Sequence, residues 1–257
     1  MTVDPKLTEA TRCLVALRTA QDGLRLASLP CWSDGEALWL ARADSDPVVE
    51  ALRGAPTCAV LIGDLGAELT ATGLARIFGA GDPLGLLAHG PVIALAMAAI
   101  AVRHPREVAR AWLPRSQIRP PVAVRLALRE LRNVEAPPPR PGIAPALPAV
   151  VPADIRRRLS GLRDVVVAGE GAAGLCVERA TWSAGFVLAG DLPVSPGKAI
   201  AVAVEAGSGR GAIGVALSGE LDARGALRPV RASWWNGSRT GTAPLSTPPR
   251  GAVTLPD

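Results

Sequence analysis

Residues 22–45 read DGLRLASLPCWSDGEALWLARADS and carry the clearest structural pattern in this chain. Short apolar segments alternate there with glycine-containing turns at Asp22-Gly23 and Ser33-Asp34-Gly35, as in strands joined by hairpins. A helix-like segment follows at 48–52, and an apolar run at 57–62 adds a further strand. The pattern predicts a mainly β domain with little room for a βαβ core.

The same pattern returns in the second half of the chain. Repeats of this length indicate duplicated domains rather than solenoid units, which run about 20 to 50 residues. Chance likeness among short glycine-bounded strands is the alternative explanation. Three matched pairs are each 150 residues apart, namely Trp32 and Trp182, Gly35 and Gly185, and Ser45 and Ser195. With a shift in register the match continues from 69–73 to 215–219, and it ends with Arg132, Ala136 and Pro137 facing Arg239, Ala243 and Pro244.

The repeat predicts two domains, each with a helix (7–14 and 153–162) before its first strand. Because proline fixes φ and cannot extend a helix or a ladder, the Pro-rich stretch 137–152 is the expected linker. Two small β units of this kind are expected to pack together as an intramolecular pseudo-dimer, and a further homodimer is left open. The domains are then 1–136, with a helical insertion at about 80–118, and 153–257.

Composition indicates a globular chain and argues against nucleic acid as a partner. Apolar residues make up 49% and charged residues 20% of the sequence. The net charge of +5 and the run Arg156-Arg157-Arg158 come without a recognition motif. Aromatic stacking surfaces are scarce, since the chain has no tyrosine and two phenylalanines. A basic surface suits a small anionic ligand equally well.

Cysteine usage and the first residues predict a cytoplasmic protein. Cys13, Cys31, Cys58 and Cys176 share no CxxC spacing and lie in apolar runs, so we expect reduced core residues rather than metal ligands or disulfides. The first twelve residues are polar and carry both charge signs, which predicts no signal peptide.

One segment, 84–102, is apolar enough to raise the question of a membrane. His89, Gly90 and Pro91 interrupt it and leave an uninterrupted stretch at 92–102, too short to span a bilayer. We therefore expect a buried or dimer-forming helix and no membrane association.

Residues 22–45, together with the segments at 48–52 and 57–62, resemble the pyridoxamine 5′-phosphate oxidase-like split-barrel family. The resemblance covers most of 7–79 and 120–136 and, more weakly, 153–245. It implies a tandem split β-barrel of Greek-key type with a site for flavin mononucleotide (FMN).

The resemblance also implies the residues of that site. Arg25 matches the strand arginine that holds the flavin phosphate, and Ala41 and Arg42 match the end of the next strand. An arginine fork suits a phosphate, although Arg25 can also be read as a solvated residue on a polar strand face. Leu26, Ala27 and Ser28 match the strand backbone beside the flavin ring, while Ser45 and Lys198 belong to the phosphate turns of the two copies.

The chain departs from the family at the phosphate turn. Where relatives carry Arg and Lys after the serine, residues 45–47 are Ser-Asp-Pro, and an aspartate close to a phosphate repels it. The second copy keeps Lys198 but has Leu175 where the first has Arg25. Cations that could compensate in the first copy are Arg42, Arg53 and Arg76.

Three functions follow as hypotheses. The first is an FMN-dependent oxidoreductase that transfers hydride to or from a small molecule; because the flavin performs that chemistry, no catalytic side chain is assigned. The deazaflavin F420 is the alternative cofactor, and haem with His89 or His104 as axial ligand is less favoured. The second is a non-catalytic binder of a flavin or other anionic small molecule, and the third is a structural barrel that has lost its cofactor.

No metal site is expected, because both histidines of the chain lie in the insertion. Two further features, Glu68 and the pair Trp234-Trp235, could face the ligand or simply be strand residues.

Overall fold

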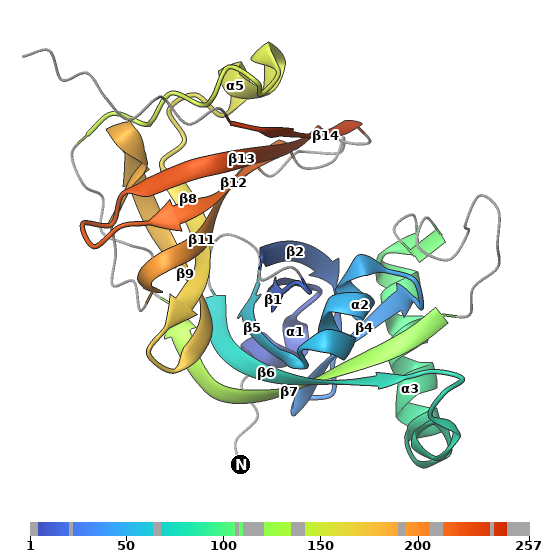
Figure 1. Cartoon of the computed structure of the whole chain (residues 1–257). Helices are drawn as coiled ribbons and strands as arrows, with labels where there is room; N and C mark the ends of the chain where they lie inside the picture. Colours follow the sequence, from blue (N-terminus) through green and yellow to red (C-terminus); the bar gives the residue numbers. More distant parts are fainter. Residues whose placement is uncertain are drawn as a thin grey trace, which may run out of the picture.

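The computed structural model contains two curled antiparallel sheets of seven strands each, which confirms the mainly β expectation (Figure 1). The first sheet comes from the N-terminal half of the chain and the second from the C-terminal half. The structure describes residues 5–20, 23–63, 68–105, 108–109, 121–134, 142–189, 194–205, 213–236 and 239–245.

The first sheet closes on itself around an apolar core. Its outer strand β2 lies against β4, near the opposite edge of the sheet. β4 also pairs with β7 rather than with β5, which follows it in sequence, as in a Greek key. The strands are β1 (Arg12–Arg18), β2 (Leu24–Pro30), β3 (Trp32–Ser33), β4 (Ala37–Ala43), β5 (Thr57–Ile62), β6 (Glu68–Phe78) and β7 (Pro121–Val134), in the order β2-β1-β5-β6-β7-β4-β3.

Five strands of the second sheet follow the same order as the first five strands of the first sheet, and the remaining two are placed differently. The run β9-β8-β11-β12-β13 corresponds to β2-β1-β5-β6-β7. The glycine turns also correspond, since Gly35 and Gly185 both have positive φ, 92° and 73°, which glycine adopts without steric cost. The strands are β8 (Asp164–Gly171), β9 (Gly174–Ser183), β10 (Val187–Ala189), β11 (Val194–Glu205), β12 (Ile213–Leu221), β13 (Leu227–Asn236) and β14 (Arg239–Pro244).

Two of the residue matches between the copies are wrong. Ser45 lies in the turn after β4, whereas Ser195 lies inside β11. Arg132 lies on β7, whose counterpart by sheet position is β13, whereas Arg239 lies on the additional strand β14. Ala136 and Pro137 lie outside the described residues.

Two of the predicted helices are shorter in the structure, and a third is present as predicted. The first helix, α1 (Pro5–Glu9), is shorter than 7–14, because residues from Arg12 onward pair with β2 and β5. The helix α5 (Ala153–Arg158) is shorter than 153–162. The helix α2 (Pro47–Gly54) contains the predicted 48–52. Of the predicted linker, 137–141 lie outside the described residues and 142–152 form no helix or strand.

The predicted interruption of the apolar segment 84–102 is wrong, since one helix, α3 (Pro83–Arg103), runs through Gly90 and Pro91. Proline removes one helical hydrogen bond, that to the carbonyl of Leu87. Leu87 and Pro91 are both exposed, so water can solvate this carbonyl. Most of the described part of the predicted insertion is helical, and residues 106–107 and 110–118 of it lie outside the described residues.

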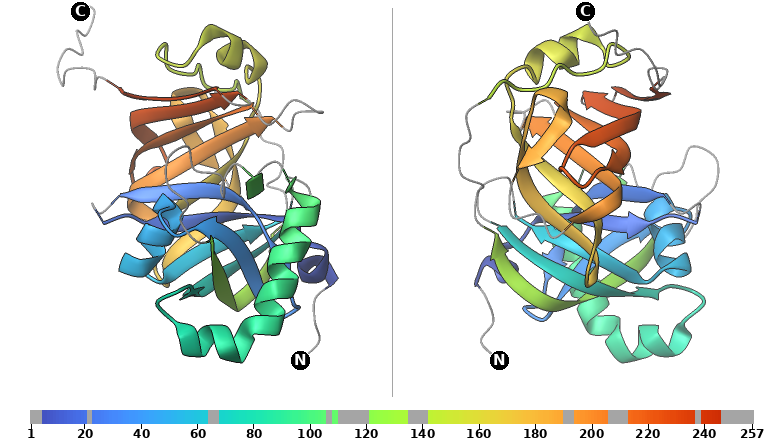
Figure 2. Two further views of the ribbon diagram at one scale, coloured as in Figure 1. Left: turned by 90° about the vertical axis from the view of Figure 1, so that its right-hand side faces the viewer. Right: turned by 60° about the vertical axis from the view of Figure 1, so that its left-hand side comes forward.

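The two sheets pack against each other through apolar faces. β1 is buried on both sides, because Val15 and Leu17 face the first barrel's core while Ala16 faces the second sheet. The hydroxyl of Thr70 donates a hydrogen bond across the contact to the carbonyl of Val177, at 2.8 Å. Figure 2 shows the two sheets stacked, with α3 on the outside of the first. The buried residues of this interdomain cluster are Ala16, Ala59, Leu61, Val166, Ala168, Leu175, Val177, Ile200 and Val202.

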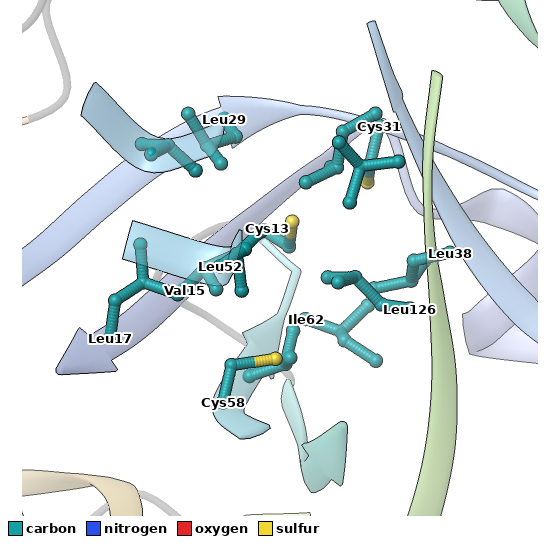
Figure 3. Packing of buried hydrophobic residues seen from close by; sticks show 14 of the residues in the cluster. Cys13, Val15, Leu17, Leu29, Cys31, Leu38, Leu52, Cys58, Ile62 and Leu126 are labelled. Atoms are coloured by element: carbon teal, nitrogen blue, oxygen red, sulfur yellow. The ribbon is translucent and has the colours of Figure 1, made fainter. Parts of the chain in front are cut away.

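Three of the four cysteines lie in the core of the first barrel (Figure 3). Cys13, Cys31 and Cys58 are at most 2% exposed, as predicted for small core residues. The fourth, Cys176, is half-buried on β9, which contacts the first sheet.

Candidate functional site

The first barrel has a seam where β2 meets β4, and the predicted site residues gather at one end of it. Every neighbouring pair in the path β2-β1-β5-β6-β7-β4 is antiparallel, so β2 and β4 also run in opposite directions. The start of β2 and the end of β4 therefore lie at the same end of the barrel. Arg25, Arg42 and Ser45 belong to that end.

Arg25 is an exposed cation at the mouth of the barrel. It pairs in register with Leu17, and strand alternation puts it on the face shared by Ala27 and Leu29, which pack into the barrel core. Being near the strand end, it is exposed while Leu29 is buried. Within the described ranges no hydrogen bond or ion pair of Arg25 is found.

Leu26 and Ser28 occupy the opposite face of β2. Leu26 packs against the interdomain cluster, so its side chain serves the contact between the sheets. The Ser28 hydroxyl accepts a hydrogen bond from Nη2 of Arg12, at 3.1 Å. A ligand beside this strand can thus reach its backbone only where these side chains leave it accessible.

Arg42 and Asp46 form an ion pair at the far end of β4. Asp46 also caps α2, because its Oδ1 accepts a hydrogen bond from the backbone N–H of Val48 at 2.8 Å. The buried Nε of Arg42 has no hydrogen-bond partner in the part of the chain that the structure describes. The preceding Ala41 is buried and packs beside Ile100 of α3.

The other two cations that could compensate at the phosphate turn are also neutralised. Arg53 pairs with Asp44, and its Nη1 donates to the carbonyl of the same residue at 3.2 Å. Arg76 pairs with Asp82 at 3.2 Å, and its guanidinium lies 4.9 Å from the ring centre of Phe78. Each of the three cations therefore has an aspartate as its ion-pair partner, and only Asp46 belongs to the Ser45-Asp46-Pro47 turn.

A cavity of about 470 Å³ opens beside these ion pairs. It includes neither Arg25 nor Arg42 in its lining, so it is separate from the seam. Its lining residues are Asp44, Arg53, Ile77, Gly79, Ala80, Gly81 and Asp82.

Lys198 comes from the second sheet. It is exposed on β11, and this strand contacts β2 across the interface. The structure thus places two of the predicted cations, Arg25 and Lys198, on strands that meet between the sheets. Leu175, which the sequence comparison matches with Arg25, is 6% exposed in the interdomain cluster.

The histidines and tryptophans named as candidates in the sequence pack against or hydrogen-bond to neighbouring residues of the fold. Nε2 of His104 lies 3.0 Å from the carbonyl of Thr11, and the His89 ring packs edge-on to Phe78 with centres 5.1 Å apart. The two tryptophans face opposite ways, with Trp234 against the second barrel's core and Trp235 against the interdomain cluster. Among the described residues no group of three or more His, Cys, Asp or Glu side chains could hold a metal ion. Glu68 begins β6.

Two interdomain ion pairs were not predicted from the sequence. Arg18 donates two hydrogen bonds of 2.7 Å to Glu170, and these lower the pKa of that carboxyl. Arg132 donates one of 2.7 Å to Glu178, whose pKa is nevertheless raised because burial outweighs the arginine. The partners lie 152 and 46 residues apart, so no local pattern could have linked them.

No protein-family model and no curated protein matches this chain. Solved structures do resemble it. A protein from Listeria innocua named for pyridoxamine 5′-phosphate oxidase is 18% identical with a TM-score of 0.33, and the match covers 50% of this chain and 91% of that one. The heme storage protein HutZ from Vibrio cholerae is 15% identical with a TM-score of 0.38, covering 51% and 94%. An F420 reductase is 14% identical with a TM-score of 0.36, covering 51% and 97%. The Listeria innocua protein carries the name of the family that residues 22–45 resemble. At these sequence identities the likeness concerns the fold alone.

Proposed function

We propose that this chain binds a flavin-type cofactor at the open end of the β2–β4 seam, and that the loaded protein is an oxidoreductase. The observation that carries the proposal is Arg25, an exposed cation at the barrel mouth with no partner among the described residues. A guanidinium in this position offers two parallel N–H donors to a phosphate.

Arg42 supports the same location. A buried N–H without an acceptor is unfavourable by about 1–3 kcal/mol, so a ligand that supplies an acceptor there gains that energy. The group that fits is therefore anionic, held by Arg25 and by Nε of Arg42, beside the backbone of β2 and Ala41.

Asp46 limits the affinity of this site. Its carboxylate pairs with Arg42 and would face any phosphate that approaches the same end of the barrel. We therefore expect a flavin that exchanges with solution rather than one retained through purification.

A bound flavin would supply hydride transfer, while this chain's residues would bind it, orient it and shield it from water. Arg25 and Arg42 act on the phosphate end of the ligand only. No side chain of the chain is assigned to proton transfer.

Titration with FMN tests the proposal, monitored by quenching of flavin fluorescence, with riboflavin and F420 as parallel probes. We expect FMN to bind more tightly than riboflavin, because only FMN carries the phosphate, and Arg25→Ala to weaken FMN binding by about tenfold or more. Arg157→Ala, an exposed arginine on α5, is the matched control and should change nothing. Equal affinity of FMN and riboflavin, or no loss in Arg25→Ala, would refute the site.

A non-catalytic binder is the second candidate, favoured by the neutralised turn around Asp44 and Asp46. Turnover separates the two functions. The FMN-loaded protein is mixed with reduced nicotinamide, and bleaching of the flavin absorbance is followed without oxygen. Flavin reduction faster than that of free FMN supports the oxidoreductase, whereas an unchanged rate assigns the binding role.

A further inference from the structure

The outward face of α3 is apolar along its whole length. Its exposed residues recur at the helical spacing of three or four, and none of them carries a charge before Arg103. A surface helix on a globular domain normally turns charged and polar residues to water. The exposed residues before Arg103 are Pro83, Leu84, Leu87, Ala88, Pro91, Ala94, Leu95, Ala98 and Val102.

These side chains are strongly exposed. Leu84 is 78% exposed, Leu87 80%, Leu95 57% and Val102 81%. The opposite face holds the helix on the first barrel, where Ala96 packs with Trp39 and Phe78, and Ile100 packs with Ala41. The exposed face is thus a stripe on an anchored helix, on the outside of the first sheet (Figure 2).

The helix is long and apolar enough to cross a bilayer, yet its attachment to the barrel holds it along the protein surface. An apolar helix held in this way can enter a membrane only sideways, with its stripe in the boundary between headgroups and acyl chains.

Charge favours one kind of membrane. Residues 83–102 contain no Asp, Glu, Lys or Arg, and the stripe itself has no ionisable side chain that could repel lipid headgroups. Positive charge follows directly, since residues 103–119 carry five arginines and one glutamate, and the chain has a net charge of +5. Basic residues next to an apolar interfacial segment attract anionic lipid.

From this geometry we propose that the α3 stripe docks in the plane of an anionic lipid bilayer. This goes beyond the flavin site and does not depend on it, because the stripe lies on the side of α3 that faces away from the barrel. It replaces the expectation of no membrane association.

Vesicle flotation tests the proposal with the full chain. We expect the protein to float with phosphatidylcholine vesicles containing phosphatidylglycerol, and about tenfold less with phosphatidylcholine alone or in high salt. The double variant Leu87→Ser/Leu95→Ser should reduce flotation by about tenfold or more, since it removes two exposed apolar side chains without touching the core. The double variant Ile143→Ser/Val230→Ser, exposed at 80% and 50% elsewhere, should float like the unmodified chain.

Three outcomes would overturn it. The first is that the protein does not float with the anionic vesicles. The second is that Leu87→Ser/Leu95→Ser floats as well as the unmodified chain, or that the unmodified chain floats equally well with neutral vesicles. The third is a mass of two chains in sedimentation without lipid that falls to one chain in that variant, because the stripe would then belong to a second copy. Circular dichroism of both double variants confirms that they are folded.

Discussion

In the first half of the chain, the strand that follows the glycine turn, β4, has seven residues and pairs along its length with β7. In the second half, β10 has three residues and pairs back onto β9, while β14 takes the place beside β13. β4 leads to α2 before the chain returns to the sheet, whereas four residues join β10 to β11. In the described part of the chain, therefore, the long strand across the seam and the capped helix behind it belong to the first half.

Under the proposed function, this difference leaves the molecule with one site instead of two. The first half contributes the seam with Arg25 and Arg42, and the second contributes the surface that covers β2. Leu175 of the second half is buried in that contact, where its apolar side chain packs in the interdomain cluster.

Removing one large core side chain from each half is the strongest test of how far they differ. Trp39 and Trp182 are each 1% exposed, so Trp39→Ala and Trp182→Ala should each cost about 3–5 kcal/mol of folding free energy. Because the interdomain cluster joins the halves, we expect both variants to shift one shared transition in urea, followed by circular dichroism and fluorescence. Two separate transitions in Trp182→Ala would show that the halves unfold independently.

The structure also separates what the sequence pattern could predict from what it could not. The strand 57–62 and the turns at Gly35 and Gly185 are correctly predicted, because a local apolar run and the glycines determine them. The helix at 7–14 was wrong because pairing with β2 and β5 overrides the local pattern, and α3 continues through Pro91 because that position is exposed. At the site, the residue types were visible in the sequence. Their neutralisation was not, since it depends on side-chain geometry at Asp44 and Asp46.

A second test compares the two interdomain ion pairs. The Glu178 side chain is 10% exposed, so Arg132→Ala leaves a nearly buried carboxylate without its partner and should cost about 1–3 kcal/mol. Glu178→Gln added to Arg132→Ala should restore most of that loss, because no charge is then buried. Urea midpoints of the single and double variants measure the effect. A double variant no more stable than Arg132→Ala would contradict it.

The two carboxylates should respond oppositely to pH. The raised pKa of Glu178 favours folding below its ordinary value of 4.5, and that contribution is lost as pH rises through the folded value. The lowered pKa of Glu170 favours folding above 4.5, and that contribution is lost as pH falls through the folded value. Stability measured from about pH 2 to 8 should therefore lose acid sensitivity below pH 4.5 in Glu170→Gln, and the protein should gain stability toward neutral pH in Glu178→Gln.

A third change removes the acid from the Ser45-Asp46-Pro47 turn, where the family that the sequence resembles carries basic residues. Asp46→Asn keeps a side-chain oxygen to cap α2 and removes the charge that pairs with Arg42. FMN should then bind about three- to tenfold more tightly at low salt, because the repulsion of the phosphate is gone. Asp222→Asn, which also accepts backbone hydrogen bonds in a turn, is the control in the other half. Unchanged affinity in Asp46→Asn would place the phosphate away from this turn.

The smallest effect is expected at the exposed interdomain pair. Arg18 and Glu170 have side chains 45% and 42% exposed, so Arg18→Ala should cost about 0.2–1 kcal/mol and less in high salt. Urea midpoints at two salt concentrations measure it. A loss of folding free energy as large as that in Arg132→Ala would mean that solvent exposure does not determine the strength of these ion pairs.

The four cysteines lie in two different parts of the molecule, so their reactivity can report which part opens. Burial raises the pKa of Cys58 to about 12, and burial with two nearby carboxylates raises that of Cys176 to about 11, so neither thiol reacts readily while it is covered. Three thiols lie inside one barrel, and the fourth lies where the sheets touch. Separation of the sheets would uncover one sulfur, and opening of the barrel would uncover the others. The number of thiols alkylated over time therefore distinguishes undocking from unfolding, with no probe added to the chain.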